Sequence, residues 1–187
     1  MSNAKVIAGM TISLDGFVAD QTGSVGRLYQ DLAALQGTAY MEALIEATGA
    51  VLMGKRAFEM GDPDSYVGNY EFQVLTHHPP SVAPNQDERL TFTFVTDGVE
   101  SAVAQAIAAA GDKVVQAIGG ASVIQQPLRA RLLDELHLDV VPVLLGAGLR
   151  FFENGGLGRL ALEKIDVQEI GARTSLRFRV KKEDENV

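Results

Sequence analysis

The sequence predicts an α/β protein of three layers, in which a mostly parallel mixed sheet lies between helices and ends in a C-terminal antiparallel hairpin. Short apolar runs that suit strands alternate with segments of helical periodicity along most of the chain. Such alternation is typical of parallel strands joined by helical crossovers on both faces of a sheet. The last third instead holds two more polar strand-like segments around Gly171, which indicates an antiparallel pair at a sheet edge.

The N-terminal third predicts one strand, one loop and one helix. A strand is expected over residues 5–13, where apolar and β-branched residues run into the turn signal Leu14-Asp15-Gly16. Residues 19–26 are small and polar, and we expect a mobile surface loop there. A helix is expected at 40–47, because its apolar residues recur at helical spacing and Gly49 follows them.

The remaining elements follow from unbroken apolar runs, which suit strands covered on both faces, and from further helical periodicity. We expect strands at 50–53, 72–76, 91–96, 114–118 and 136–143, helices at 99–110 and 123–133, and the final strands at 161–168 and 173–180. Nothing resembles a linker between them, so residues 5–180 are expected to form a single domain. The charged residues 181–187 are expected to fray.

Composition narrows the function classes. The 187 residues are 47% hydrophobic and 21% charged, as in globular proteins, and the absence of cysteine excludes disulfides and thiolate metal sites. A net charge of −8 without any Lys/Arg-rich run disfavours nucleic acid and anionic membranes as partners. Because no membrane-length apolar stretch or signal-peptide pattern is present, we expect a cytoplasmic protein whose partner is a small-molecule substrate.

Two glycine-containing segments after predicted strands are candidate phosphate sites. The first consists of Ile118, Gly119, Gly120, Ala121, Ser122 and Val123. Backbone amides where this turn opens a helix could cradle a phosphate, although a glycine pair also suits any turn that needs positive φ. The second, Gly54-Lys55-Arg56-Ala57, adds two cations, although solvated residues at a helix start would also explain them. On adjacent strands the two segments could share one pyrophosphate.

Other chemistry finds less support. Thr76 and His77 end another predicted strand, where they could contact a ribose phosphate or simply lie on a surface loop. We expect no metal site, because His77 and His78 would point apart along a strand and His137 falls inside a predicted core strand. The sequence also lacks the nucleophile elbow of the serine hydrolases, the P-loop and the Rossmann fingerprint.

Three motifs resemble the dihydrofolate reductase-like superfamily, and more closely its branch with the C-terminal reductase domain of the bifunctional riboflavin-biosynthesis deaminase-reductase. They are Ser13-Leu14-Asp15-Gly16, the segment Val51-Leu52-Met53-Gly54-Lys55-Arg56, and a longer stretch from Ile118-Gly119-Gly120 through Asp134-Glu135-Leu136-His137-Leu138 to residues 142–148. The resemblance covers nearly the whole chain. It implies a dihydrofolate reductase-like fold and NADPH as the cofactor.

The resemblance also implies roles for individual residues. The Gly119-Gly120 turn and the helix start after it would hold the NADPH pyrophosphate. Gly54, Lys55, Arg56 and Ala57 would lie at the phosphates, and Thr76 and His77 near the adenosine 2′-phosphate. The catalytic candidate is Asp15, beside the nicotinamide, with Ser13, Gly16 and Phe17 against the substrate. Asp15 could complete the reduction as a proton donor, or it could be a turn residue that caps its own backbone.

The implied activity is NADPH-dependent hydride delivery to a small heterocyclic or imine-like substrate, as in 5-amino-6-(5-phosphoribosylamino)uracil reduction. The alternatives are a dihydrofolate reductase and a non-catalytic NADP(H)-binding module. The carboxylate that orients folate in dihydrofolate reductases would fall nearest Thr38, with Asp31 and Glu42 as poor substitutes, and the chain has no tryptophan. The resemblance and the apolar stretch 138–149 also suggest a homodimer.

Overall fold

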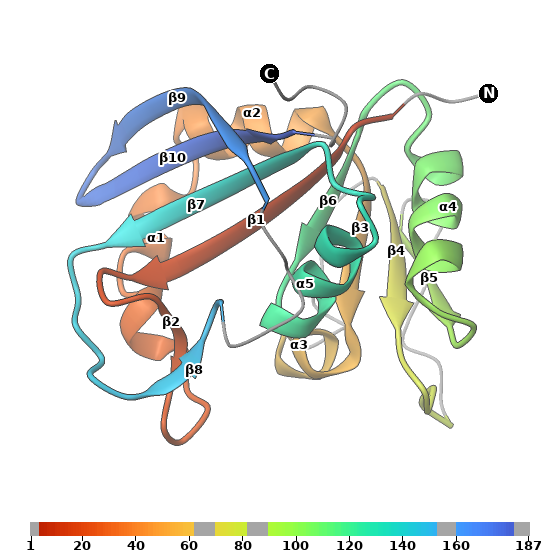
Figure 1. The fold of residues 1–187 in the computed structure, drawn as a ribbon, viewed down its shortest axis with the longest axis horizontal. Helices are drawn as coiled ribbons and strands as arrows, with labels where there is room; N and C mark the ends of the chain where they lie inside the picture. The colour runs from red at the N-terminus through yellow and green to blue at the C-terminus, as the bar shows by residue number, and fades with distance from the viewer. Residues whose placement is uncertain (1–3, 62–69, 82–89, 153–159, 182–187) are drawn as a thin grey trace.

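The computed structural model describes residues 4–61, 70–81, 90–152 and 160–181. In chain order its elements are β1 (Val6–Ser13), β2 (Phe17–Asp20), the 3-10 turn η1 (Gly26–Leu28), α1 (Leu32–Leu35), α2 (Ala39–Ala47), β3 (Thr48–Gly54), α3 (Lys55–Met60), β4 (Tyr70–Leu75), β5 (Leu90–Val95), α4 (Val99–Ala110), β6 (Val114–Ile118), α5 (Ala121–Arg129), β7 (Glu135–Val141), β8 (Gly148–Arg150), β9 (Leu162–Ile170) and β10 (Arg173–Val180) (Figure 1).

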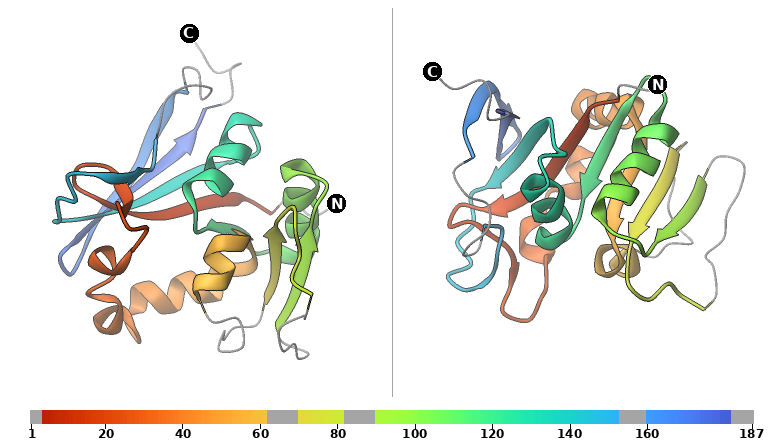
Figure 2. Two further views of the ribbon diagram at one scale, coloured as in Figure 1. Left: turned by 90° about the horizontal axis from the view of Figure 1, so that it is seen from below. Right: turned by 45° about the vertical axis from the view of Figure 1, so that its right-hand side comes forward.

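An eight-stranded sheet forms the middle of three layers. Its strand order is β5-β4-β3-β6-β1-β7-β10-β9, and a separate two-stranded sheet pairs β2 with β8. The first six strands of the large sheet run parallel to one another, β10 runs antiparallel to β7, and β9 runs antiparallel to β10. Helices α4 and α5 cover one face, and α1, α2 and α3 lie on the other (Figure 2). The predicted three-layer fold with a C-terminal antiparallel hairpin is confirmed.

Both faces of the central strand β3 are buried, which explains its unbroken apolar run. Ala50 and Leu52 belong to the apolar cluster that α4 and α5 complete. Val51 and Met53 point the other way, into a cluster with Phe58 of α3. Burying each of these larger side chains contributes on the order of 2 kcal/mol, so β3 is held by packing from above and below.

The predicted loop at 19–26 is wrong at its start. Ala19 and Asp20 belong to β2, where Ala19 pairs with Leu149 and Asp20 with Gly148. The partner strand, β8, has only three residues, and a strand so short gives no period-2 pattern. The rest of the predicted loop is a tight turn, in which the Asp20 carboxylate accepts hydrogen bonds from the backbone N–H groups of Thr22 and Ser24.

Helix α5 starts two residues earlier than predicted and ends four residues earlier, at Arg129. Arg131 takes the left-handed conformation, with φ 58°, which stops the helix although apolar spacing continues to Leu133. The elements α1, α3 and η1 were not predicted, because four, six and three residues are too few to show a helical period.

Residues 182–187 of the predicted tail lie outside the described residues, and the backbone N–H of Lys181 donates to the Ala161 carbonyl. In the described parts of the chain, no helix has the length and apolar character needed to cross a membrane. Within those same parts, no three or more metal-ligating side chains come together.

Candidate functional site

The two glycine segments meet where β3 and β6 end. These strands are parallel neighbours, with Met53 opposite Ile118. The helices that follow them leave toward opposite faces of the sheet, α3 on one side and α5 on the other (Figure 2). A crevice opens at such a point in α/β sheets and is where ligands bind.

Glycine is required on both sides of this crevice for the two helix starts to come close. A Cβ on Gly54 would lie 2.6 Å from Cγ2 of Val123, at the start of α5. A Cβ on Gly119 would collide with the Cβ of Ala57 in α3, and Gly119 also has φ +67°. Gly54 and Gly119 therefore have a packing function, and a glycine in the sequence after a strand does not by itself distinguish packing from phosphate binding.

Gly120 differs from these two glycines because nothing lies within 4 Å of its Cβ position. It is the N-cap of α5, it has φ 64°, and no side chain caps the helix there. Gly120 also lines a cavity together with Gly119. The predicted cofactor residues Ala121, Ser122 and Val123 are not among the described lining residues, and Ala121 and Val123 are buried. Backbone amides at a helix start attract anions, and in α5 the Val123 N–H already donates to the Gly120 carbonyl at 3.1 Å.

We call this space the first cavity; it has a volume of about 790 Å³. Its walls come from β2 and the turn after it, from the starts of α3 and α5, and from β8. Arg56 lines it, and one guanidinium nitrogen lies 3.4 Å from where a Cβ of Gly23 would be. Lys55 instead pairs with Glu59 at 3.6 Å and is absent from the described lining. The structure therefore separates the two adjacent cations.

Asp15 connects two motifs that are far apart in the sequence. Its carboxylate accepts hydrogen bonds from Ser13 Oγ at 2.6 Å, from the backbone N–H of Leu145 at 3.1 Å and from that of Gly146 at 2.7 Å. The hydrogen bond from Ser13 and those from the two amides lower the pKa of Asp15 to about 2. An ionised carboxylate with these donors holds a loop about 130 positions away in the chain, which differs from the sequence interpretation that Asp15 caps its own backbone. Its role as proton donor stays a prediction.

The loop that Asp15 holds leads into β8, one wall of the first cavity. Gly148 must be glycine, because a Cβ there would overlap the backbone of Ala19 in β2. Across the same small sheet, the Arg150 guanidinium lies over the Phe17 ring at 4.4 Å. As far as the structure describes the linings, Ser13, Gly16 and Phe17 are not among the residues of either cavity. They shape the turn and strand behind the wall.

We call the space beside it the second cavity, with a volume of about 440 Å³. It shares with the first cavity the lining residues Met10, Tyr29, Leu32, Ala57 and Gly119, so the two cavities lie side by side, and we call them together the cleft. The second cavity is lined from the sheet by residues of β1, β3, β6 and β7 and from the other side by residues of α1 and α2, which lie on the face opposite α4 and α5 (Figure 2). Most of its lining is apolar, but polar side chains come from Thr11, Tyr40, Gln116, His137, Asp139 and Arg173.

We call these six polar side chains of the second cavity the polar wall, and Arg173 is at its centre. Its side chain is 3% exposed, and its Nε and Nη2 donate to the two carboxylate oxygens of Asp31, each at 2.6 Å. Nη1 donates to Thr11 Oγ1 at 3.0 Å and lies 3.5 Å from a carboxylate oxygen of Asp139. The hydrogen bond and the charge of the guanidinium lower the pKa of Asp31. Two carboxylates thus share one cation.

The other two titratable groups of this wall are neutral at pH 7. The phenol of Tyr40 donates to Asp139, with 3.2 Å to the nearer oxygen, and burial together with that carboxylate raises its pKa. His137 Nε2 lies 3.0 Å from Glu135 Oε2. Burial of the imidazole outweighs that carboxylate and lowers the pKa of His137. His137 is therefore a neutral hydrogen-bonding group rather than a cation.

The structure places the remaining residues singled out in the sequence as follows. The Thr76 hydroxyl donates to the His78 carbonyl and accepts from the His78 N–H. His77 is exposed and follows the end of β4, whose last residue, Leu75, pairs with Gly54, so His77 lies at the same end of the sheet as Gly54. Thr38 caps α2 by accepting a hydrogen bond from the Met41 N–H, and Glu42 is exposed.

Sequence reasoning missed the polar wall. The signal available was small: Asp139 and His137 interrupt an apolar strand, and Arg173 begins another. Charged residues in a buried strand need partners, but those partners come from α1, α2 and β1. No local pattern shows which residues the fold brings together.

The comparisons with known proteins agree with this architecture. Residues 4–176 match the family described as the RibD C-terminal domain. The chain belongs to the RibD C-terminal domain family. One relative, the uncharacterized protein YwjB of Bacillus subtilis strain 168, is 27% identical over 151 residues, which are 79% of this chain and 82% of YwjB.

Solved structures show the same fold. A putative riboflavin biosynthesis protein from Shewanella sp. PV-4 has a TM-score of 0.76 at 21% identity, covering 97% of this chain and 100% of its own. The Thermotoga maritima deaminase/5-amino-6-(5-phosphoribosylamino)uracil reductase scores 0.68 at 16% identity, over 95% of this chain and 57% of the bifunctional protein. Enterococcus faecalis dihydrofolate reductase complexed with NADP(H) scores 0.63 at 18% identity, over 95% and 97%. These similarities confirm that this RibD C-terminal domain protein has the dihydrofolate reductase-like fold.

Proposed function

We propose that this RibD C-terminal domain protein is an NADPH-dependent reductase that binds the dinucleotide along the first cavity and its substrate in the second. The observation that carries the proposal is the junction of the two cavities. They meet at Ala57 and Gly119, beside the carboxyl ends of β3 and β6. A cofactor in one cavity and a substrate in the other would touch there, as hydride transfer requires.

The first cavity fits a dinucleotide phosphate in its chemistry. The Gly119-Gly120 turn before α5 offers backbone amides, and Arg56 offers a guanidinium that can bind phosphate through two parallel hydrogen bonds. NADPH, when bound, would supply the hydride. The residues at the junction, among them Met10, Tyr29 and Leu32, would exclude water and orient the reacting rings.

The substrate is expected to be a small heterocyclic or imine-like compound. The family and the reductase name of the Thermotoga relative support this chemical type. Folate is disfavoured, because Asp31, a substitute for the folate-orienting carboxylate, is already bound through both oxygens to Arg173. A non-catalytic NADP(H)-binding module would keep the first cavity and transfer no hydride, so loss of NADPH absorbance with any acceptor separates it from a reductase.

A titration with NADPH and NADH, followed by cofactor fluorescence and thermal shift, tests the cofactor site. We expect NADPH to bind more tightly than NADH. Arg56→Ala is expected to weaken NADPH binding by about tenfold, the effect of losing roughly 1.4 kcal/mol of charge-assisted contact. Lys55→Ala is the matched control, because Lys55 pairs with Glu59, and it should change the affinity by less than about twofold. Absence of NADPH binding, or equal losses in both variants, would contradict the proposal.

A further inference from the structure

The floor of the second cavity has a glycine that neither the backbone nor the packing requires. Gly9 lies in the middle of β1, paired with Ile118 on one side and His137 on the other. Its φ is not positive, and a Cβ there would meet only Gln116 Oε1 at an ordinary 3.7 Å. Glycine weakens a strand interior and often marks close approach of a ligand. Gly9 therefore leaves a flat floor open to the cavity.

Hydrogen-bonding capacity remains unused beside this floor. Asp139 accepts from Tyr40 at 3.2 and 3.4 Å, but two carboxylate oxygens offer about four acceptor positions. The Gln116 side chain is 7% exposed, and within the described chain its amide makes no hydrogen bond. Both side chains line the cavity. An amide and a carboxylate around a flat floor suit a planar ligand with N–H groups at its edge.

The charges of the wall disfavour an anion. Arg173 is the one cation among the described residues that line the cavity, and its donors already serve Asp31, Thr11 and the Leu28 carbonyl. The Asp139 carboxylate is a second anion beside this guanidinium, with Oδ2 3.5 Å from Arg173 Nη1. Neighbouring Arg177 is not among the described lining residues, and its Nη2 lies 3.4 Å from Gln168 Oε1. A phosphate in this cavity would face the Asp139 carboxylate and a guanidinium that already makes four hydrogen bonds and is shared by two carboxylates.

We propose that the second cavity binds a flat, unphosphorylated heterocycle stacked over Gly9, with its N–H groups donating to Asp139. The inference rests on the proposed function, because it names the substrate class of the same cleft. It makes Asp139 the specificity-determining residue. A phosphoribosyl substrate would find no free cation among the described residues of the cavity.

Binding of three probes to the NADPH-free protein, measured by calorimetry, tests this inference separately from the cofactor site. The probes are 2,6-diaminopurine, which carries N–H donors, purine, which lacks the amino groups, and ribose 5-phosphate. We expect 2,6-diaminopurine to bind at least about tenfold more tightly than purine, and ribose 5-phosphate not to bind.

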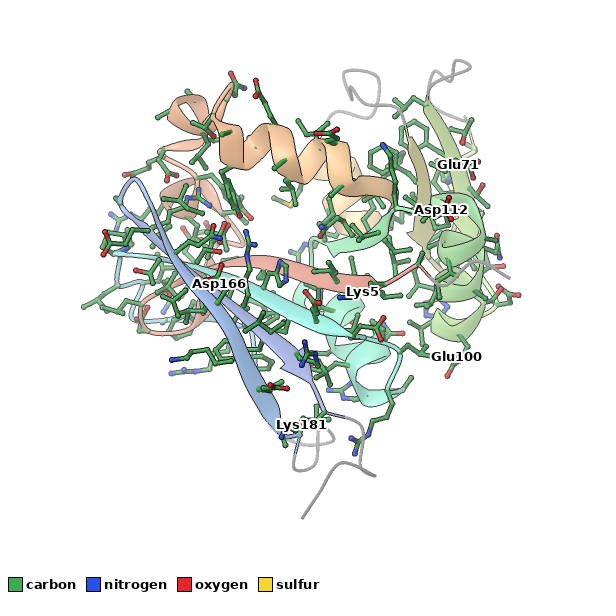
Figure 3. The ribbon with its side chains drawn as sticks, turned by 90° about the horizontal axis from the view of Figure 1, so that it is seen from above. Lys5, Glu71, Glu100, Asp112, Asp166 and Lys181 are labelled. Atoms are coloured by element: carbon green, nitrogen blue, oxygen red, sulfur yellow. The ribbon has the colours of Figure 1, made fainter. Side chains whose placement is uncertain are left out.

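The variants locate the site. Asp139→Asn should weaken 2,6-diaminopurine binding about tenfold, and Asp166→Asn on the edge strand β9 is the matched control (Figure 3). Gly9→Ala should fold normally, because its Cβ meets no clash, yet weaken this probe about tenfold by raising the floor. Both Asp139→Asn and Gly9→Ala should keep NADPH affinity within about twofold.

The outcomes distinguish the two proposals. Tighter binding of ribose 5-phosphate than of 2,6-diaminopurine, no binding of any probe, or no effect of Asp139→Asn would overturn the substrate class. If NADPH still binds and Arg56→Ala still weakens it, the proposed reductase function survives that result. If NADPH does not bind but the probe results hold, the cofactor proposal fails by itself.

Discussion

The two cavities of the cleft are built in different ways. The first takes its chemistry from backbone turns at two neighbouring strand ends, where Gly54 and Gly119 let helix starts approach and Gly120 faces the open space. The second takes its chemistry from side chains on separate elements, such as Asp31 and Arg173, which are 142 positions apart. A site made of turns is encoded in short segments, whereas a polar wall exists only after the sheet has formed.

This difference predicts different failures. Damage to the polar wall should cost stability first, because the wall holds α1 and β10 to β1 through buried charges. Damage to the glycine turns should affect cofactor binding at a smaller cost in stability.

The largest expected effect comes from Arg173→Met. Removing the guanidinium leaves Asp31 and Asp139 without their shared cation, which should lower the free energy of unfolding by about 3–5 kcal/mol. Urea unfolding measures this change. Arg179→Met removes a pair whose two side chains are about half exposed, and it should cost about 1 kcal/mol or less. Equal losses would show that the polar wall does not stabilise the fold.

A smaller effect is expected from Gly119→Ala. The new methyl group would collide with Ala57 and occupy a left-handed position, so we expect a loss of about 1–3 kcal/mol and weaker NADPH binding. Ala57→Gly in the same chain should restore part of both losses by making room.

Gly120→Ala is the control for that pair, because its Cβ position is open although φ is +64°. Gly120→Ala should lower the free energy of unfolding by about 1 kcal/mol through backbone strain, and adding Ala57→Gly should restore neither its stability nor its NADPH binding. If Ala57→Gly rescued neither property of Gly119→Ala, the contact between the two helix starts would not position the crevice.

The smallest effect concerns acid stability and Asp15. Its pKa is about 2 in the folded protein, below the ordinary aspartate pKa of 3.8, so its stabilising contribution is present above pH about 4 and is lost as the pH falls toward about 2. Asp15→Asn removes this contribution, so the urea midpoint of the wild type should fall more steeply between pH 5 and 2. Parallel curves for the two proteins would show that the Asp15 hydrogen bonds to Leu145 and Gly146 do not stabilise the fold.

The sequence predicted the sheet well because its buried strands are continuous apolar runs. Strand β6 and helix α4 have the expected bounds, and the Gly119-Gly120 turn opens a helix beside Gly54 as expected. The packing of Gly54 on Val123, the loop held by Asp15, and the distinction between Lys55 and Arg56 were not predictable. Each depends on a contact between segments far apart in the chain or on which way one side chain points.

Hydrogen–deuterium exchange with and without NADPH locates the bound cofactor on the unaltered protein. We expect slower exchange on NADPH addition in the first turn of α5 and at the start of α3, around Gly120 and Arg56, with little change in β9 and β10. Protection confined to other segments, or no protection at saturating NADPH, would contradict the assignment of the first cavity as the cofactor site.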